Sequence, residues 1–282
     1  MTWEANIMII PVSVKNQSID SSGITSDYKA AISEYVWNGF EANATKVDIE
    51  YTLNEAFGIR ELIIKDNGDG INYDELRETF CAFLASKKNL LSLQMKSKAN
   101  KGKGRFSFIA FSNEAEWNTV YKDNAVYKEY DINMSSDKKE VIECSEPRLS
   151  NKKETGTAVK FTNINTLTAE DMEFDIIEPA LLKDFAWFLY LYKNKNVQIA
   201  INNVKIDYKK YINTELSEKY MAEIEEYTFE INLVVWQKSI SEKFCCYYFD
   251  NKNVLKGNKT TTFNRNTINF NHSVFVKSEF FN

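Results

Sequence analysis

Residues 27–45 of the chain read DYKAAISEYVWNGFEANAT, and the architecture can be worked out from this stretch. It contains one glycine and no proline, and its apolar residues fall on several faces, which predicts a largely buried helix. Glu34 and Asn38 are four positions apart, so they share one face of that helix, and Glu41 continues the same face. A carboxylate can orient and deprotonate a water, and an amide oxygen suits Mg²⁺. A solvent-facing polar stripe is the alternative.

A glycine-rich turn follows two predicted strands. Residues 46–51 and 60–65 have strand character, and the second runs directly into Asp66-Asn67-Gly68-Asp69-Gly70. Glycines permit positive φ and close backbone approach, and a carboxylate at the strand end can accept a hydrogen bond from an adenine amino group. A calcium loop does not fit, because its twelfth position, counted from Asp66, is Arg77 rather than glutamate. A plain turn is the alternative.

A lysine-rich segment, residues 85–103, contains no acidic residue and leads into Gly102-Lys103-Gly104-Arg105-Phe106. Its glycines leave backbone N–H groups free to face an anion, and a helix beginning at Arg105 would add the positive end of its dipole. The lysines and Arg105 would bring positive charge to a triphosphate. The spacing matches neither a Walker loop nor a dinucleotide fingerprint. A solvated basic loop is the alternative.

The rest of the chain predicts an α+β fold in two parts. Thr155-Gly156-Thr157 precedes the strand-like AVKFTNI, which would place Thr157 beside the pocket. A helix is expected over residues 72–84, and strands are expected over residues 116–121, 125–132, 141–144 and 157–162, which together indicate an antiparallel or mixed sheet covered by helices. Beyond a boundary near residues 166–178, the pattern predicts a helix over 177–193, a hairpin over 197–207, and strands over 227–237, 243–250 and 273–276.

In their order and spacing, these features resemble the Bergerat-fold ATPases, the GHKL family of gyrase, heat-shock chaperones, histidine kinases and MutL. The resemblance covers about residues 25–165. The family motifs correspond to the Glu-x-x-x-Asn helix at 34–45, the Asp-x-Gly-x-Gly turn at 66–70, the glycine-rich lid end at 102–106 with Ser86-Lys87 upstream, and the Gly-Thr pair at 156–157.

The resemblance implies a role for each matched position. Glu34 would be the catalytic general base for the attacking water, Asn38 would hold Mg²⁺, and Asp66 would bind the adenine amino group. The other contacts to ATP would come from Gly68, Gly70, Ile71 and Thr157 around the base, and from Lys87, Gly102, Lys103, Gly104, Arg105 and Phe106 around the phosphates. Glu41 is longer than the Asp that the family usually has there.

The resemblance also implies a domain order. We expect an N-terminal strap over residues 1–25, an ATP-binding Bergerat domain over 26–170, and the start of a transducer-like α/β domain over 171–282, so that the chain is the front part of a longer protein. In the gyrase, chaperone and MutL branch, the second domain supplies a lysine to the γ-phosphate, and Lys256 or Lys259 is the candidate here. The only histidine, His272, follows the pocket motifs and is expected on a surface or strand, which argues against a histidine kinase.

The implied function is Mg²⁺-dependent ATP binding and hydrolysis. ATP would close a lid and drive homodimerisation, as a conformational switch for a larger protein or complex. Two alternatives stay open: a nucleotide-gated binding module without turnover, and the ATPase part of a DNA-repair, topoisomerase-like or defence machine. The net charge of -5 gives no support to nucleic-acid binding.

The composition places the protein in the cytoplasm with no membrane partner, because no stretch is long and apolar enough to cross a bilayer. Its cysteines form no CxxC pair, so we expect reduced thiols at Cys81, Cys144, Cys245 and Cys246.

Overall fold

The computed structural model describes residues 7–11, 24–80, 104–264 and 270–282, and its chain divides into two compact units. The first unit comprises Met1–Ile177 and Asn194–Ile206, and the second comprises Glu178–Lys193 and Asp207–Asn282.

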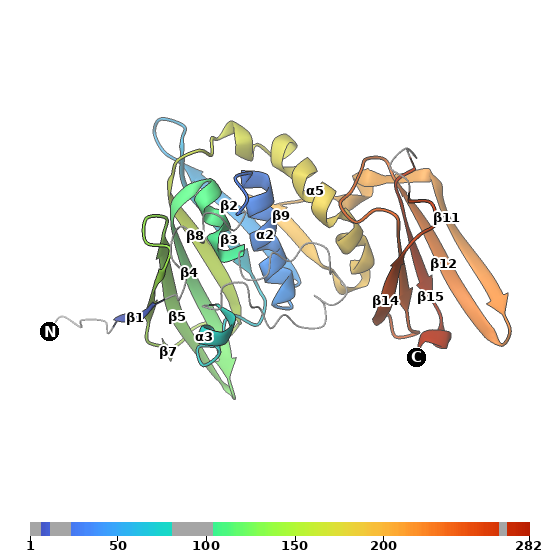
Figure 1. Ribbon diagram of the computed structural model, residues 1–282, viewed down its shortest axis with the longest axis horizontal. Helices are drawn as coiled ribbons and strands as arrows, with labels where there is room; N and C mark the ends of the chain where they lie inside the picture. Colours follow the sequence, from blue (N-terminus) through green and yellow to red (C-terminus); the bar gives the residue numbers. More distant parts are fainter. Residues whose placement is uncertain (1–6, 12–23, 81–103, 265–269) are drawn as a thin grey trace. The chain divides into compact units, whose positions relative to one another are not determined.

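The first unit is built on one mixed, mostly antiparallel sheet, which confirms the expected α+β class (Figure 1). Its described strands are β1 (Ile7–Pro11), β2 (Lys46–Leu53), β3 (Ile59–Asp66), β4 (Ser112–Asp123), β5 (Val126–Ser135), β6 (Val141–Ser145), β7 (Arg148–Leu149), β8 (Gly156–Ile164), β9 (Gln198–Ile201) and β10 (Val204–Lys205). They lie in the order β1-β6-β5-β4-β8-β3-β2-β9-β10, with β7 paired to β5. The sequence neighbours β2 and β3 pair antiparallel, whereas β2 and β9 pair in parallel.

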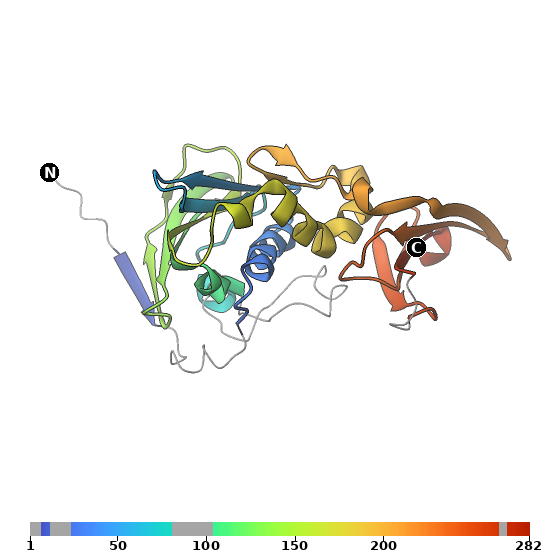
Figure 2. The ribbon, with the colours of Figure 1, turned by 90° about the horizontal axis from the view of Figure 1, so that it is seen from above.

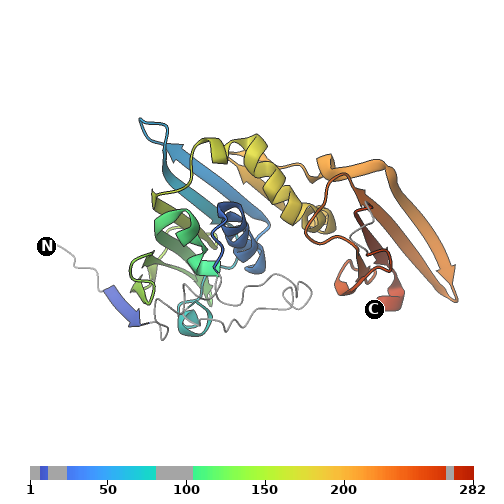
Figure 3. The ribbon, with the colours of Figure 1, turned by 45° about the horizontal axis from the view of Figure 1, so that its top comes forward.

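Helices cover one face of this sheet. Helix α2 (Tyr28–Glu41) is capped by Asp27, whose side chain accepts the Lys29 N–H at 2.9 Å, and it lies beside the 3₁₀ helix η1 (Gly104–Ala110) (Figure 3). Tyr35 of α2 packs edge-on against Phe161 of β8, with ring centroids 4.8 Å apart. The buried strand residues on this side, such as Val159 and Phe161, alternate with more exposed ones, as one covered face requires.

The other face of the sheet is polar. Lys160 pairs with Glu116 across β8 and β4, at 2.5 Å, and Arg148 pairs with Glu129 and Asp131 of β5, at 3.1 and 2.9 Å. Ion pairs on an open face contribute little to stability. They do show that this face is built to meet water rather than a second apolar layer.

Two segments differ from their expected form. The helix expected over residues 72–84 is a single turn, α3 (Leu76–Thr79), and the part of that range beyond Phe80 lies outside the described residues. The hairpin expected over 197–207 forms as β9 and β10, but it belongs to the first unit rather than to a second domain beginning at residue 171. Its apolar residues Ile199 and Ile201 are buried where β9 pairs in parallel with β2.

The second unit packs a helix against a separate sheet. Helix α5 (Phe174–Leu191) contributes its residues from Glu178 onward to this unit. The described strands are β11 (Ile212–Ile224), β12 (Tyr227–Trp236), β13 (Cys245–Phe249), β14 (Leu255–Thr260) and β15 (His272–Lys277), in the order β11-β12-β15-β13-β14. Figure 2 shows β11 and β12 as one long hairpin. Short 3₁₀ turns, η2 (Glu170–Met172), η3 (Lys193–Lys195), η4 (Tyr208–Tyr211) and η5 (Glu279–Phe281), complete the described elements.

Stacked aromatic rings form the core of this unit. Trp187 of α5 stacks on Tyr247 of β13 at 5.6 Å, and Tyr247 stacks on Phe275 of β15 at 5.2 Å. His272 is on strand β15, as expected, but it is buried, with hydrogen bonds to Thr261 Oγ1 and to the Phe270 carbonyl, each at 2.9 Å.

Free thiols occur at Cys144, Cys245 and Cys246, whereas Cys81 lies outside the described residues. Among the helices that can be described, none has both the length and the apolar character that crossing a bilayer requires.

Candidate functional site

Asp66 stands at the end of β3 with its carboxylate held from one side. Its Oδ1 accepts the backbone N–H of Gly68 at 2.8 Å and that of Thr157 at 3.3 Å. Burial raises the pKa of Asp66 to about 6, although the two N–H donors lower it and nearby Asp69 raises it further. Its Oδ2 accepts no hydrogen bond within the part of the chain that the structure describes. This oxygen is therefore available to an N–H group of a ligand.

Glycines allow the surrounding backbone to close around this carboxylate. A methyl group at Gly39 of α2 would lie 2.9 Å from Asp66 Cβ, so the helix can pack against the strand end only because Gly39 lacks a side chain. Gly70 has a φ of 75°, and a methyl group there would lie 2.1 Å from the Val120 carbonyl oxygen. A methyl group at Gly68 would similarly meet the Ala42 carbonyl oxygen at 2.4 Å. The glycines of the 66–70 turn are thus required by close contacts.

Threonine hydroxyls connect this turn to β4 and β8. The Ile71 N–H donates to Thr119 Oγ1 at 2.9 Å, and Thr119 Oγ1 lies 3.0 Å from Thr157 Oγ1. The Tyr130 hydroxyl donates to the Ile71 carbonyl at 3.0 Å, so both backbone groups of Ile71 are fixed. Sequence reasoning missed Thr119 and Tyr130. For Thr119 a signal existed, because it is a polar residue at an inward position of the alternating segment that contains Ala115 and Trp117.

A second cluster lies where α2 meets the start of η1. A methyl group at Gly104 would lie 3.2 Å from Glu34 Oε2 and 3.5 Å from Asn38 Nδ2, so these two side chains meet the glycine backbone directly. The Tyr35 hydroxyl, which is fully inside the core, donates to the Arg105 carbonyl at 2.9 Å and ties α2 to η1. The expected grouping of Glu34, Asn38 and Gly104 is therefore present.

The remaining predicted residues divide into three groups. Arg105 and Phe106 are buried at the start of η1, and the Arg105 guanidinium lies 4.6 Å from the centre of the Phe106 ring. Lys87, Gly102 and Lys103 lie outside the described residues, as does Ser86. In the second unit, Lys256 pairs with Asp250 at 3.1 Å, and Lys259 is exposed on β14.

This arrangement fits a nucleotide and a hard cation. The Oδ2 atom of Asp66 suits an adenine amino group, and Gly104, beside Glu34 and Asn38, lies at the start of η1, where backbone N–H groups favour an anion. Mg²⁺ usually takes few protein ligands and completes its shell with phosphates and waters. Among the described residues there is no group of three or more His, Cys, Asp or Glu that could hold a metal ion.

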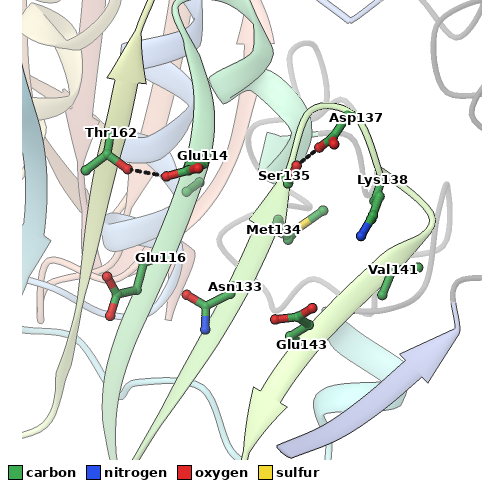
Figure 4. Close-up of a pocket in the computed structure, with 11 residues that line it drawn as sticks. Glu114, Glu116, Asn133, Met134, Ser135, Asp137, Lys138, Val141, Glu143 and Thr162 are labelled. Carbon is green, nitrogen blue, oxygen red and sulfur yellow. Dashed lines mark hydrogen bonds between the residues drawn. The ribbon is translucent and has the colours of Figure 1, made fainter.

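A distinct pocket of about 260 Å³ lies on the open face of the sheet (Figure 4). Its lining includes four carboxylates and one lysine, which are Glu114, Glu116, Asp137, Glu143 and Lys138. Thr162 donates to Glu114 there, at 2.9 Å. Four carboxylates would repel a triphosphate, so this pocket does not suit the phosphates of a nucleotide.

Comparison with models of known protein families identifies the family of this part of the chain. A family model described as "Histidine kinase-, DNA gyrase B-, and HSP90-like ATPase" matches residues 25–166, which is half of the chain. Residues 25–166 include both the residues around Asp66 and the cluster of Glu34, Asn38 and Gly104. No curated protein matches the chain.

Proposed function

Because the chain belongs to the family of histidine kinase-, DNA gyrase B- and HSP90-like ATPases, we propose that its first unit binds ATP with Mg²⁺ and hydrolyses it. Binding would drive lid closure and homodimerisation, and turnover would reverse them, so that the chain acts as a conformational switch for a larger protein or complex. The observation that carries this proposal is the convergence of Glu34 and Asn38 on the Gly104 backbone.

The base end supports ATP as the ligand. Asp66 has one carboxylate oxygen fixed by two backbone donors, and its other oxygen can accept the exocyclic N–H of adenine. At neutral pH the carboxylate is ionised, because its pKa of about 6 lies below that pH. A charged acceptor makes a stronger hydrogen bond than a neutral one.

The phosphate end supports hydrolysis. Asn38 would hold Mg²⁺ through its amide oxygen, and the ion would neutralise charge on the phosphates. Glu34, one helical turn away on the same face, would orient the attacking water and take its proton. The buried Tyr35–Arg105 hydrogen bond would keep Glu34 and the glycine backbone in register during that step.

The test is ATP turnover and ATP binding, measured together on the wild type and on Glu34→Gln. This change keeps the shape of the side chain and removes its ability to act as a base. We expect the variant to bind ATP with near wild-type affinity and to lose at least a hundredfold in turnover. Glu50→Gln, on the exposed side of β2, is the matched control and should match the wild type. Absence of ATP binding by the wild type would refute the proposal. Binding without turnover would favour the nucleotide-gated binding module.

Dimerisation and DNA binding require separate measurements. Sedimentation with a non-hydrolysable ATP analogue should reveal a dimer that the nucleotide-free protein lacks, and a monomer at high protein concentration would remove this part of the proposal. A DNA mobility shift that weakens with added salt would favour the DNA-machine alternative.

A further inference from the structure

Strand β11 is a free edge of the second unit's sheet. Among the described strands it pairs only with β12, and it stands at one end of the order β11-β12-β15-β13-β14 (Figure 1). In an antiparallel strand, alternate residues turn their N–H and C=O groups toward the neighbouring strand, and the rest turn them away. The outer row of backbone groups on β11 is therefore open to another strand.

Apolar side chains accompany these open backbone groups. Tyr220, Met221 and Ile224 keep 47%, 63% and 58% of their surfaces exposed. They belong to Glu218–Ile224, the stretch over which β11 pairs with β12 in regular register. A long apolar edge is a template for pairing with another chain, and a lysine on the edge commonly prevents it. Whether Lys219 prevents pairing here depends on the residue that a second strand would place opposite it.

The charges of β11 are complementary to those of a second copy. Because Glu218–Ile224 is centred on Met221, a two-fold axis at Met221 pairs the whole regular stretch antiparallel with its copy. This register places Lys219 opposite the partner's Glu223 on both sides of the axis, and opposite charges in directly facing positions stabilise a sheet. Lys219 contacts Glu230 of its own chain at 2.8 Å, and its three N–H donors can serve both carboxylates.

Neighbouring registers lose this complementarity. With the axis at Lys219, the two lysines would face each other, and with the axis at Tyr220, Lys219 would face the partner's Met221. With the axis at Ala222, Glu218 would face the partner's Glu226. Like charges directly opposite each other are destabilising. In the register centred on Met221, Glu218 instead faces the partner's Ile224, so no two carboxylates of the regular stretch oppose each other.

We propose that the second unit associates with a second copy of itself through β11, which joins the two five-stranded sheets across a two-fold axis at Met221. The same surface is used by both copies, so the contact closes at two chains. It needs no nucleotide and no residue of the first unit, so it goes beyond the ATP-driven association proposed above. One strand edge is small beside the roughly 1,200–2,000 Å² that stable interfaces bury, so this dimer forms at high protein concentration.

The test is sedimentation of the nucleotide-free protein over a wide range of concentration. The mass of the wild type should rise from that of a monomer toward that of a dimer and no further. Lys219→Glu and Glu223→Lys each replace the two ion pairs across the axis by two contacts between like charges. Each variant should dimerise at least about tenfold more weakly than the wild type.

An equimolar mixture of these two variants tests the register itself. In a mixed pair, one copy carries acidic side chains at positions 219 and 223 and the other carries basic ones, so ion pairs form again on both sides of the axis. The mixture should therefore dimerise about as strongly as the wild type, although neither variant does so alone. Glu226→Lys is the matched control, because it changes the net charge as Glu223→Lys does but lies in the exposed turn beyond the paired stretch. It should not weaken the dimer.

A disulfide provides a second measurement that does not depend on the charge variants. Directly opposed residues of antiparallel strands have Cα atoms about 4.5–5.5 Å apart, which is within the reach of a disulfide. Met221→Cys should therefore form a disulfide-linked dimer on mild oxidation, whereas the wild type and Glu226→Cys should not. Thermal midpoints close to that of the wild type would show that the variants fold.

The outcomes separate this inference from the proposed function. A wild type that stays monomeric at every concentration, charge variants that dimerise as the wild type does, or a mixture that does not recover would each show that the inference is wrong. Absence of a disulfide in Met221→Cys would also contradict it. None of these results involves a nucleotide, so the proposed function would stand. A protein that binds no ATP but dimerises through β11 would have the opposite meaning.

Discussion

Replacing Asp66 with Asn should make the protein more stable while it weakens ATP binding. Burial raises the pKa of Asp66 from 3.8 to about 6 in the folded state, so keeping the carboxylate ionised there costs free energy. A difference of about 2 pKa units corresponds to about 3 kcal/mol, as an upper limit, at about 1.36 kcal/mol per unit. Asparagine has the same shape, and its oxygen can still accept the N–H groups of Gly68 and Thr157.

The stability difference between Asp66→Asn and the wild type should depend on pH. Between about pH 4 and pH 6 the folded wild type binds more protons at Asp66 than the unfolded chain does, so its stability falls as pH rises through that window. Above about pH 6 the folded protein bears the full free-energy cost of keeping the buried Asp66 carboxylate ionised. The variant lacks the titrating group and escapes the cost. Its advantage in unfolding free energy should therefore be near zero at pH 4 and about 1–3 kcal/mol at pH 8.

The assay is urea unfolding at both pH values, followed by tryptophan fluorescence, together with ATP titration at pH 8. We expect ATP affinity to fall by about tenfold to a hundredfold, because a neutral acceptor replaces a charged one. Asp74→Asn is the matched control, since it removes an exposed carboxylate eight residues further along the chain, and its effect on stability should stay within about 0.5 kcal/mol. An Asp66→Asn variant that is less stable than the wild type at pH 8, or equally favoured at both pH values, would refute this reasoning.

Three other substitutions test other contacts. Gly70→Ala should lower the free energy of unfolding by at least about 2 kcal/mol and abolish ATP binding, because the new methyl group would lie 2.1 Å from the Val120 carbonyl oxygen. Gly257→Ala is the control: its methyl group would have nothing within 4 Å, so unfolding and ATP binding should stay almost unchanged. Tyr35→Phe should lower the free energy of unfolding in urea by about 1–2 kcal/mol, because it removes the buried hydroxyl that donates to the Arg105 carbonyl, and an unchanged free energy would contradict this role. Lys210→Met should destabilise the second unit by about 1–2 kcal/mol, because Glu178 is buried and loses two bonds of 3.0 and 3.2 Å. Lys209→Met, at the neighbouring exposed lysine, is the control. An equal loss of stability in the two variants would contradict the role of the Lys210–Glu178 ion pair.

Much of the geometry of the candidate site could be predicted from the sequence because its motifs are local. The four-residue spacing of Glu34 and Asn38 places them on one helical face whatever surrounds the helix. The glycines of the 66–70 turn likewise mark close backbone contacts before the neighbouring chain is known. Thr119 could not be assigned in this way, because its role depends on Ile71 and Thr157, which are distant along the chain.

Sheet membership was harder to predict than strand formation. The hairpin at residues 197–207 was expected, but its partner β2 lies about 150 residues earlier, and nothing in a short parallel strand identifies its neighbour. Strand β11 was not expected at all. Its sequence INTELSEKYMAEI is rich in residues that favour helices, and antiparallel pairing with β12 overrides that preference.

The path of the chain between the two units affects how the protein can be divided. The backbone passes from one unit to the other after Ile177, returns at Asn194, and leaves again after Ile206. A fragment cut at residue 170 would lose β9, and β2 would become a free sheet edge able to pair with other chains and aggregate. A fragment extended to residue 206 would retain α5 but lose the second unit's strands, which would expose apolar side chains such as Phe185 and Trp187. No single cut therefore yields two soluble halves, and damage to the second unit should also reduce the yield of the ATP-binding unit.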